Sequence, residues 1–137
     1  MHDVTAGEDV ALSAEAVWGV IGDFSGIRKW ATLVESETTE DTADGKVRTL
    51  TMPGGRVVRE RLVESGDHFY TYTLPRPDMV DYVSTVSVKP VGPGASHIEL
   101  IVRFTPKDET ALTEIGEQLG KFLRGNLKAM KRALALT

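Results

Sequence analysis

The sequence contains no cysteine. This absence excludes disulfides, thiolate metal sites and a cysteine nucleophile, and it suits a reducing compartment. No apolar run approaches the roughly 20 residues that a membrane-spanning helix needs. The first ten residues, MHDVTAGEDV, also lack the basic start and apolar centre of a secretory signal peptide. We therefore expect a soluble cytoplasmic protein without stable membrane insertion.

Basic residues are not in excess either. The chain has 16 Lys and Arg against 20 Asp and Glu, a formal net charge of -4. Proteins that neutralise nucleic-acid phosphates or hold an anionic membrane surface do so with a basic excess. We therefore expect no nucleic-acid partner. The length of 137 residues is enough for one core but not for two, which predicts a single domain over 1–137.

Several catalytic motifs are missing. Three scattered histidines without cysteine give no metal-ligand spacing, and no G-x-S-x-G nucleophile motif occurs. The PGG at 53–55 and the GPG at 92–94 lie between expected strands, not at the strand-to-helix junction of a phosphate-binding loop. We expect neither a metal nor an organic cofactor.

The pattern of the chain predicts an α+β domain. After a first edge strand, Ser13 can cap a helix that stops near Gly22, and a brief helical turn over 25–30 ends at Trp30, which should be at least half buried. Turn signals divide 34–105 into six antiparallel strands.

The segment 107–137 predicts one long amphipathic helix, and the sheet must bury one face against it. Its apolar stripe comprises Leu112, Ile115, Leu119, Phe122, Leu123, Leu127, Met130 and Leu134.

One face of the predicted sheet is unusually polar. Side chains two residues apart on a strand point to the same face of the sheet. If Val58 and Leu62 point into the core, Glu60 therefore points there too. The same reasoning turns further polar residues inward, namely Arg48, Tyr70, Tyr72, Tyr82 and Ser84, and Asn126 interrupts the apolar stripe of the last helix. Burying an unpaired carboxylate lowers the folding stability by an amount on the order of several kcal/mol. Glu60 therefore needs Arg48, tyrosine hydroxyls or cavity water as partners.

Taken together, these residues resemble the START-like SRPBCC superfamily, in its polyketide cyclase/dehydrase and lipid-transport branch, over nearly the whole chain. The segments that carry the resemblance are AEAVWGVIGDFSGIRKW, GKVRTLTMPGGRVVRERL, FYTYTL, DYVSTVSV and IELIVRFTP. The resemblance implies a helix-grip fold, in which a curved antiparallel sheet wraps around a long C-terminal helix with an internal apolar cavity.

The sequence departs from such relatives at two places. Ala31 and Thr32 follow Trp30, where relatives often have His and Pro, and Leu100 stands where they often have Trp. The first departure removes an acid/base candidate near the cavity entrance. The second could enlarge or reshape the cavity.

The resemblance implies that a hydrophobic or aromatic small molecule binds in the cavity. If the protein is an enzyme, it would be a cofactor-independent cyclase or dehydratase performing aldol-type cyclisation or dehydration, with Glu60 as acid/base and Arg48 as oxyanion stabiliser. The alternatives are a non-catalytic carrier of a lipid or other apolar metabolite, and a protein-interaction module with a vestigial cavity. Arg48 and Glu60 could equally form a structural ion pair that fixes strand register.

Nine residues are candidates for contact with the ligand. Tyr72 and Tyr82 would orient a substrate, and Trp30 could cover the entrance or simply anchor the short second helix. The full set is Trp30, Tyr70, Tyr72, Tyr82, Ser84, Leu100, Phe122, Asn126 and Met130. The exposed first strand leaves both a monomer and a homodimer open.

Overall fold

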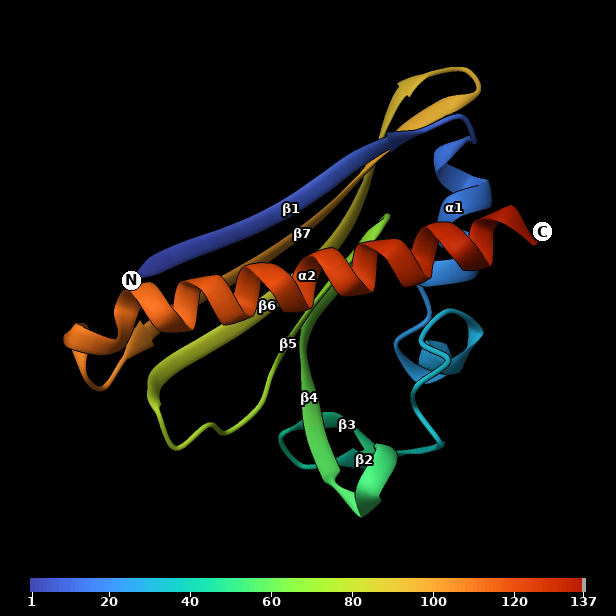
Figure 1. Cartoon of the computed structure of the whole chain (residues 1–137). Coiled ribbons are helices and arrows are strands. Elements are labelled where there is room, and N and C mark those ends of the chain that lie inside the picture. The colour runs from blue at the N-terminus through green and yellow to red at the C-terminus, as the bar shows by residue number, and fades with distance from the viewer. Residues whose placement is uncertain (137) are drawn as a thin grey trace.

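The computed structural model describes residues 1–136, which form one seven-stranded antiparallel sheet with helices on its concave side (Figure 1). The spatial order of the strands is β1-β7-β6-β5-β4-β3-β2. Their bounds are β1 His2–Val10, β2 Ser36–Thr42, β3 Gly45–Thr51, β4 Val57–Gly66, β5 Phe69–Thr73, β6 Met79–Gly92 and β7 Ala95–Pro106. The prediction of six strands after the first is confirmed.

Two α-helices and three short 3-10 helices complete the fold. They are α1 Ala14–Ile21, η1 Phe24–Lys29, η2 Pro53–Gly55, η3 Glu109–Ala111 and α2 Leu112–Ala135. The Ser13 side chain accepts a hydrogen bond from the Ala16 amide and α1 ends at Gly22, as predicted. The long helix begins at Leu112 and not at Lys107, because Asp108 caps η3 first. The predicted extension of the helix to Thr137 lies outside the described residues.

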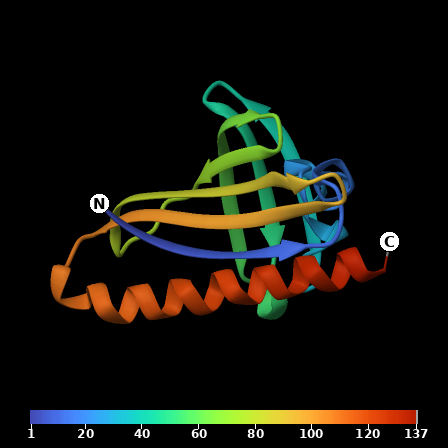
Figure 2. The same cartoon turned by 90° about the horizontal axis from the view of Figure 1, so that it is seen from above.

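The sheet is strongly curved around α2. Figure 2 shows β1, β7 and β6 running along the helix while β2, β3 and β4 turn across it. The register shift in β4 between Leu62 and Glu64 is a bulge of the kind that bends a sheet. Helix α2 packs on β1, β7 and α1, so it covers one half of the concave face. At the other end of the sheet, η1 packs against β2.

The buried core confirms most of the predicted apolar stripe, but the placement of Phe122 on it is wrong. Leu119, Leu123 and Met130 are buried, whereas Phe122 is 48% exposed. Successive residues of an α-helix turn by about 100°. Phe122 is therefore carried to the flank of α2 beyond the surface that contacts β1 and β7.

Within 1–136, no helix is long and apolar enough to cross a membrane. In the same part of the chain, His, Asp and Glu side chains do not gather in the groups of three or more that would hold a metal ion.

Candidate functional site

Arg48 and Glu60 form a buried ion pair on the concave face of the sheet. They occupy directly paired positions of β3 and β4, and Arg48 Nε donates to Glu60 Oε1 over 2.8 Å. The Arg48 side chain is 1% exposed and that of Glu60 is 10% exposed. The inward orientation inferred from strand alternation is thus confirmed, and the partner of Glu60 is Arg48.

Three aromatic rings surround the Arg48 guanidinium. Its Cζ lies 4.2 Å from the ring centre of Phe24, 4.8 Å from that of Tyr72 and 5.6 Å from that of Tyr70. Nη1 also donates to the Phe24 carbonyl over 3.0 Å. Cation–π contacts of a desolvated guanidinium are worth about 2 kcal/mol. Arg48 therefore joins η1 to the sheet from inside a closed aromatic cage.

The electrostatics of this cluster keep the cation charged and the phenols neutral. Burial disfavours the Arg48 charge, but the neighbouring Tyr70 and Glu60 more than offset it, so the pKa of Arg48 is raised. Burial and the negative charge of Glu60 raise the pKa of Tyr72. Burial raises the pKa of Tyr70 as well, although Arg48 opposes the shift. The Tyr70 hydroxyl is buried and lacks a well-formed hydrogen bond, even though it lies beside Arg48.

A groove opens beside Glu60 because β5 is shorter than its neighbours. The last pairs of β5 are Thr73 with Arg61 of β4 and Tyr72 with Ser84 of β6. The chain then continues as LPRPD, and the two prolines lack the amide donors that would extend the ladder. Beyond Thr73, β4 and β6 consequently have no strand between them.

This β5 groove has a volume of about 620 Å³. Its walls combine apolar side chains with arginines at the surface. They comprise Val47, Arg59, Glu60, Arg61, Thr73, Leu74, Pro75, Arg76, Met79, Val80, Asp81, Tyr82 and Val83. Among residues 1–136, no group hydrogen-bonds to Glu60 Oε2. The groove therefore combines an apolar wall with one carboxylate oxygen available as an acceptor.

Tyr82 is the second buried polar residue that lines the groove. It is 6% exposed, the Arg76 guanidinium lies 5.3 Å from its ring centre, and burial raises its pKa. Arg76 itself is held by a bidentate pair with Asp78, at 3.1 and 3.0 Å. This pair also lowers the pKa of Asp78.

The structure places the predicted catalytic and ligand-contact residues in four different settings. Glu60 and Tyr82 line the β5 groove, Asn126 is half-buried on α2, and Phe122 is exposed. The remaining candidates are buried in the core, namely Trp30, Arg48, Tyr70, Tyr72, Ser84, Leu100 and Met130. Trp30 ends η1 and is 3% exposed, with its Nε1 buried and unpartnered.

Apart from Glu60 and Tyr82, the sequence interpretation did not single out the residues that line the β5 groove, among them Leu74, Arg76 and Met79. The available signal was the pair of prolines at 75 and 77, which cannot donate to a strand ladder. The predicted enclosed cavity stays a prediction, since the hollow beside Glu60 is an open groove.

Comparison with known proteins identifies the family. A family model described as polyketide cyclase/dehydrase and lipid transport matches residues 1–135. The structure of an uncharacterised protein from Bacillus thuringiensis has 30% sequence identity and a TM-score of 0.72, and the match covers 98% of this chain and 99% of that one. No curated protein shows significant similarity to the sequence.

Two more distant structures share the fold. A START superfamily protein from Mycobacterium smegmatis is 19% identical with a TM-score of 0.77, and the match covers 100% of both chains. The di-domain ARO/CYC BexL of the BE-7585A biosynthetic pathway is 14% identical with a TM-score of 0.84, over 99% of this chain and 47% of that protein. The chain therefore belongs to the polyketide cyclase/dehydrase and lipid transport family, and it has the helix-grip fold of the START superfamily.

Proposed function

We propose that the β5 groove binds an apolar or aromatic small molecule and that Glu60 exchanges a proton with it. The observation that carries this proposal is the position of Glu60, which lines the groove while Arg48 holds its Oε1 and leaves Oε2 without a hydrogen bond from residues 1–136. A carboxylate fixed at one oxygen can present the other to a ligand in a defined direction.

The reaction class is proton transfer next to a carbonyl group. Glu60 removes a proton from the carbon beside the carbonyl, and the resulting enolate carbon attacks a second carbonyl of the same molecule in an aldol-type cyclisation. The protonated Glu60 then returns the proton to the alkoxide. In a dehydration, Glu60 removes the proton from the carbon beside the carbonyl, the enolate electrons form the carbon–carbon double bond as the β-hydroxyl is expelled, and the protonated Glu60 gives its proton to that hydroxyl, which leaves as water. Tyr82 orients the substrate, and Arg48, enclosed by aromatic rings, acts on Glu60 as a positioning residue.

The family description and the ARO/CYC assignment of BexL support this reaction class. At 14% identity, BexL contributes the fold and not the residues. The apolar side chains in the groove wall, Leu74, Pro75, Met79 and Val80, support an apolar ligand independently of these relatives.

A non-catalytic carrier is the second candidate, and the engagement of Arg48 favours it. Arg48 is bonded to Glu60 and to the Phe24 carbonyl, a pattern that also serves to brace η1 against the sheet. In a carrier the groove would bind an apolar metabolite without chemistry, and Glu60 would be structural.

A thermal-shift screen with aromatic polyketides, fatty acids and quinones tests ligand binding. A ligand that binds the native state raises the melting temperature as its concentration exceeds the dissociation constant. The ligand that stabilises most is then incubated with the wild type, with Glu60→Gln and with Glu64→Gln, an exposed carboxylate on the same strand. Circular dichroism first verifies that each variant is folded.

For an enzyme, Glu60→Gln should retain binding and lose about 10²–10⁴-fold in turnover, while Glu64→Gln matches the wild type. Retained binding without turnover in any of the three proteins would support the carrier. Full turnover in a folded Glu60→Gln variant would rule out Glu60 as the acid/base.

A further inference from the structure

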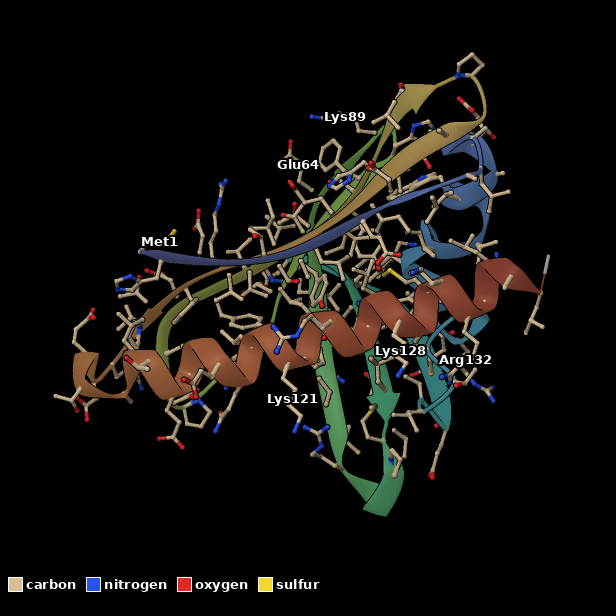
Figure 3. All side chains as sticks on the ribbon, turned by 45° about the horizontal axis from the view of Figure 1, so that its top comes forward. Met1, Glu64, Lys89, Lys121, Lys128 and Arg132 are labelled. Carbon is tan, nitrogen blue, oxygen red and sulfur yellow. The ribbon has the colours of Figure 1, made fainter. Side chains whose placement is uncertain are left out.

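The part of α2 from Lys121 onward is strongly basic, although the whole chain carries a net charge of -4. Its five cations, all between 121 and 132, are Lys121, Arg124, Lys128, Lys131 and Arg132, and the sequence from 118 to 136 contains no acidic residue. Figure 3 marks Lys121, Lys128 and Arg132 along this part of the helix. At about 100° per residue, the five lie on one side of α2, toward solvent and β1.

Part of this basic side lines a groove between α2 and the edge of the sheet. The β1/α2 groove has a volume of about 450 Å³ and is formed by Thr5, Ala6, Gly7 and Glu8 of β1 with Arg124, Leu127, Lys128 and Lys131 of α2. Arg124 lines this groove together with the β1 residues, and its Nη1 would lie 3.0 Å from a Cβ placed on Gly120 of the same helix. The groove is separate from the β5 groove, with which it shares no lining residue.

Charge pairing within the β1/α2 groove is incomplete. Lys131 forms an ion pair with Glu8, which removes one charge of each sign. Within the described part of the chain, Arg124 and Lys128 have no carboxylate partner. In addition, among residues 1–136 β1 pairs only with β7, so no other strand there uses its outer backbone edge.

From this arrangement we infer that the β1/α2 groove is a binding site for a phosphate group. A phosphate monoester carries a charge of about -1.5 to -2 near pH 7, which balances Arg124 and Lys128 together. A single carboxylate would leave one cation uncompensated. Arginine and lysine side chains beside free backbone amides are the donors that phosphate oxygens accept from. The phosphate can belong to a soluble phosphoester or to a lipid head group.

NMR titration with inorganic phosphate and with glycerol 3-phosphate tests the site, at constant ionic strength set with chloride. Saturable shifts are expected for the amides of Thr5 to Glu8 and of Arg124 to Lys131. The Arg124→Gln/Lys128→Gln variant should weaken binding at least about tenfold. The control Lys121→Gln removes a cation from the same helix outside the groove, and it should change the dissociation constant by less than about twofold.

Vesicle flotation separates the two sources of phosphate. Binding to phosphatidic acid vesicles, whose head group is a phosphate monoester, but not to phosphatidylcholine vesicles, with the same loss in the double variant, identifies a lipid head group. Saturable phosphate binding without flotation identifies a soluble phosphoester. Shifts that never saturate, or that fall equally in Lys121→Gln and in the double variant, would show general electrostatic attraction and overturn the inference.

Discussion

Arg48 donates from Nε to Oε1 of Glu60 over 2.8 Å, across directly paired positions of β3 and β4. The same guanidinium donates from Nη1 to the Phe24 carbonyl in η1. One buried side chain thus connects two strands and the short helix that covers them. This connection holds the Glu60 carboxylate at the edge of the β5 groove.

Removing Arg48 should destabilise the protein severely. In Arg48→Ala the Glu60 carboxylate loses its partner in a nearly buried position, and the aromatic cage loses its centre. We expect the free energy of unfolding to fall by about 3–5 kcal/mol, as for other broken buried pairs. Urea denaturation followed by circular dichroism measures the change.

The matched control is Arg59→Ala, because Arg59 pairs with Glu40 at the surface over 3.1 Å. That exposed pair should contribute at most about 1 kcal/mol. Replacing both buried partners, as Arg48→Met with Glu60→Leu, should recover most of the loss because no buried charge is left unpaired. Equal costs for Arg48→Ala and Arg59→Ala would show that the buried pair has no special weight.

Alkaline pH should unfold the protein through its tyrosines. Tyr70, Tyr72 and Tyr82 are the only three tyrosines in the sequence, and the folded state raises the pKa of each. A raised pKa contributes stability that is fully present below the ordinary tyrosine value of about 10. This stability is lost as the pH rises from there toward the folded-state values.

Ultraviolet absorbance of tyrosinate, recorded together with circular dichroism, follows both events. We expect little ionisation near pH 10 while the native spectrum persists, and then ionisation that coincides with unfolding. A tyrosine that titrates with an ordinary pKa in the native protein would contradict the burial described for that residue.

Neighbouring residues of α2 should respond very differently to truncation. Leu123 is 2% exposed and Phe122 is 48% exposed. Leu123→Ala should cost about 2–5 kcal/mol through the cavity it leaves, and Phe122→Ala about 1 kcal/mol or less. Denaturant midpoints of the two variants give the comparison. The reverse order would place Phe122 in the core.

Strand alternation was sufficient to orient the polar residues of the sheet. Arg48, Glu60 and Tyr72 are in phase with apolar neighbours, and a period of two leaves only two faces to choose between. The helical pattern, in contrast, predicted the wrong burial for Phe122. An amphipathic helix offers a continuous range of directions, and the edge of its buried stripe depends on which strands it contacts.

Neither groove could be predicted from the local sequence pattern. The β5 groove results from a difference in length between β5 and its neighbours, and strand ends are set by pairing as well as by the prolines at 75 and 77. The positive charge of the β1/α2 groove cannot be inferred from the net charge of the chain. Acidic residues elsewhere in the sequence outnumber the cations on this side of α2.

The central claim is that the ligand occupies the β5 groove beside Glu60, and NMR titration tests it most directly. The probe is whichever polyketide, fatty acid or quinone raises the melting temperature most. We expect saturable shifts at Glu60, Leu74, Met79 and Tyr82, which line the groove, and none at Thr5 to Glu8. Saturable shifts confined to residues outside the β5 groove would contradict the claim.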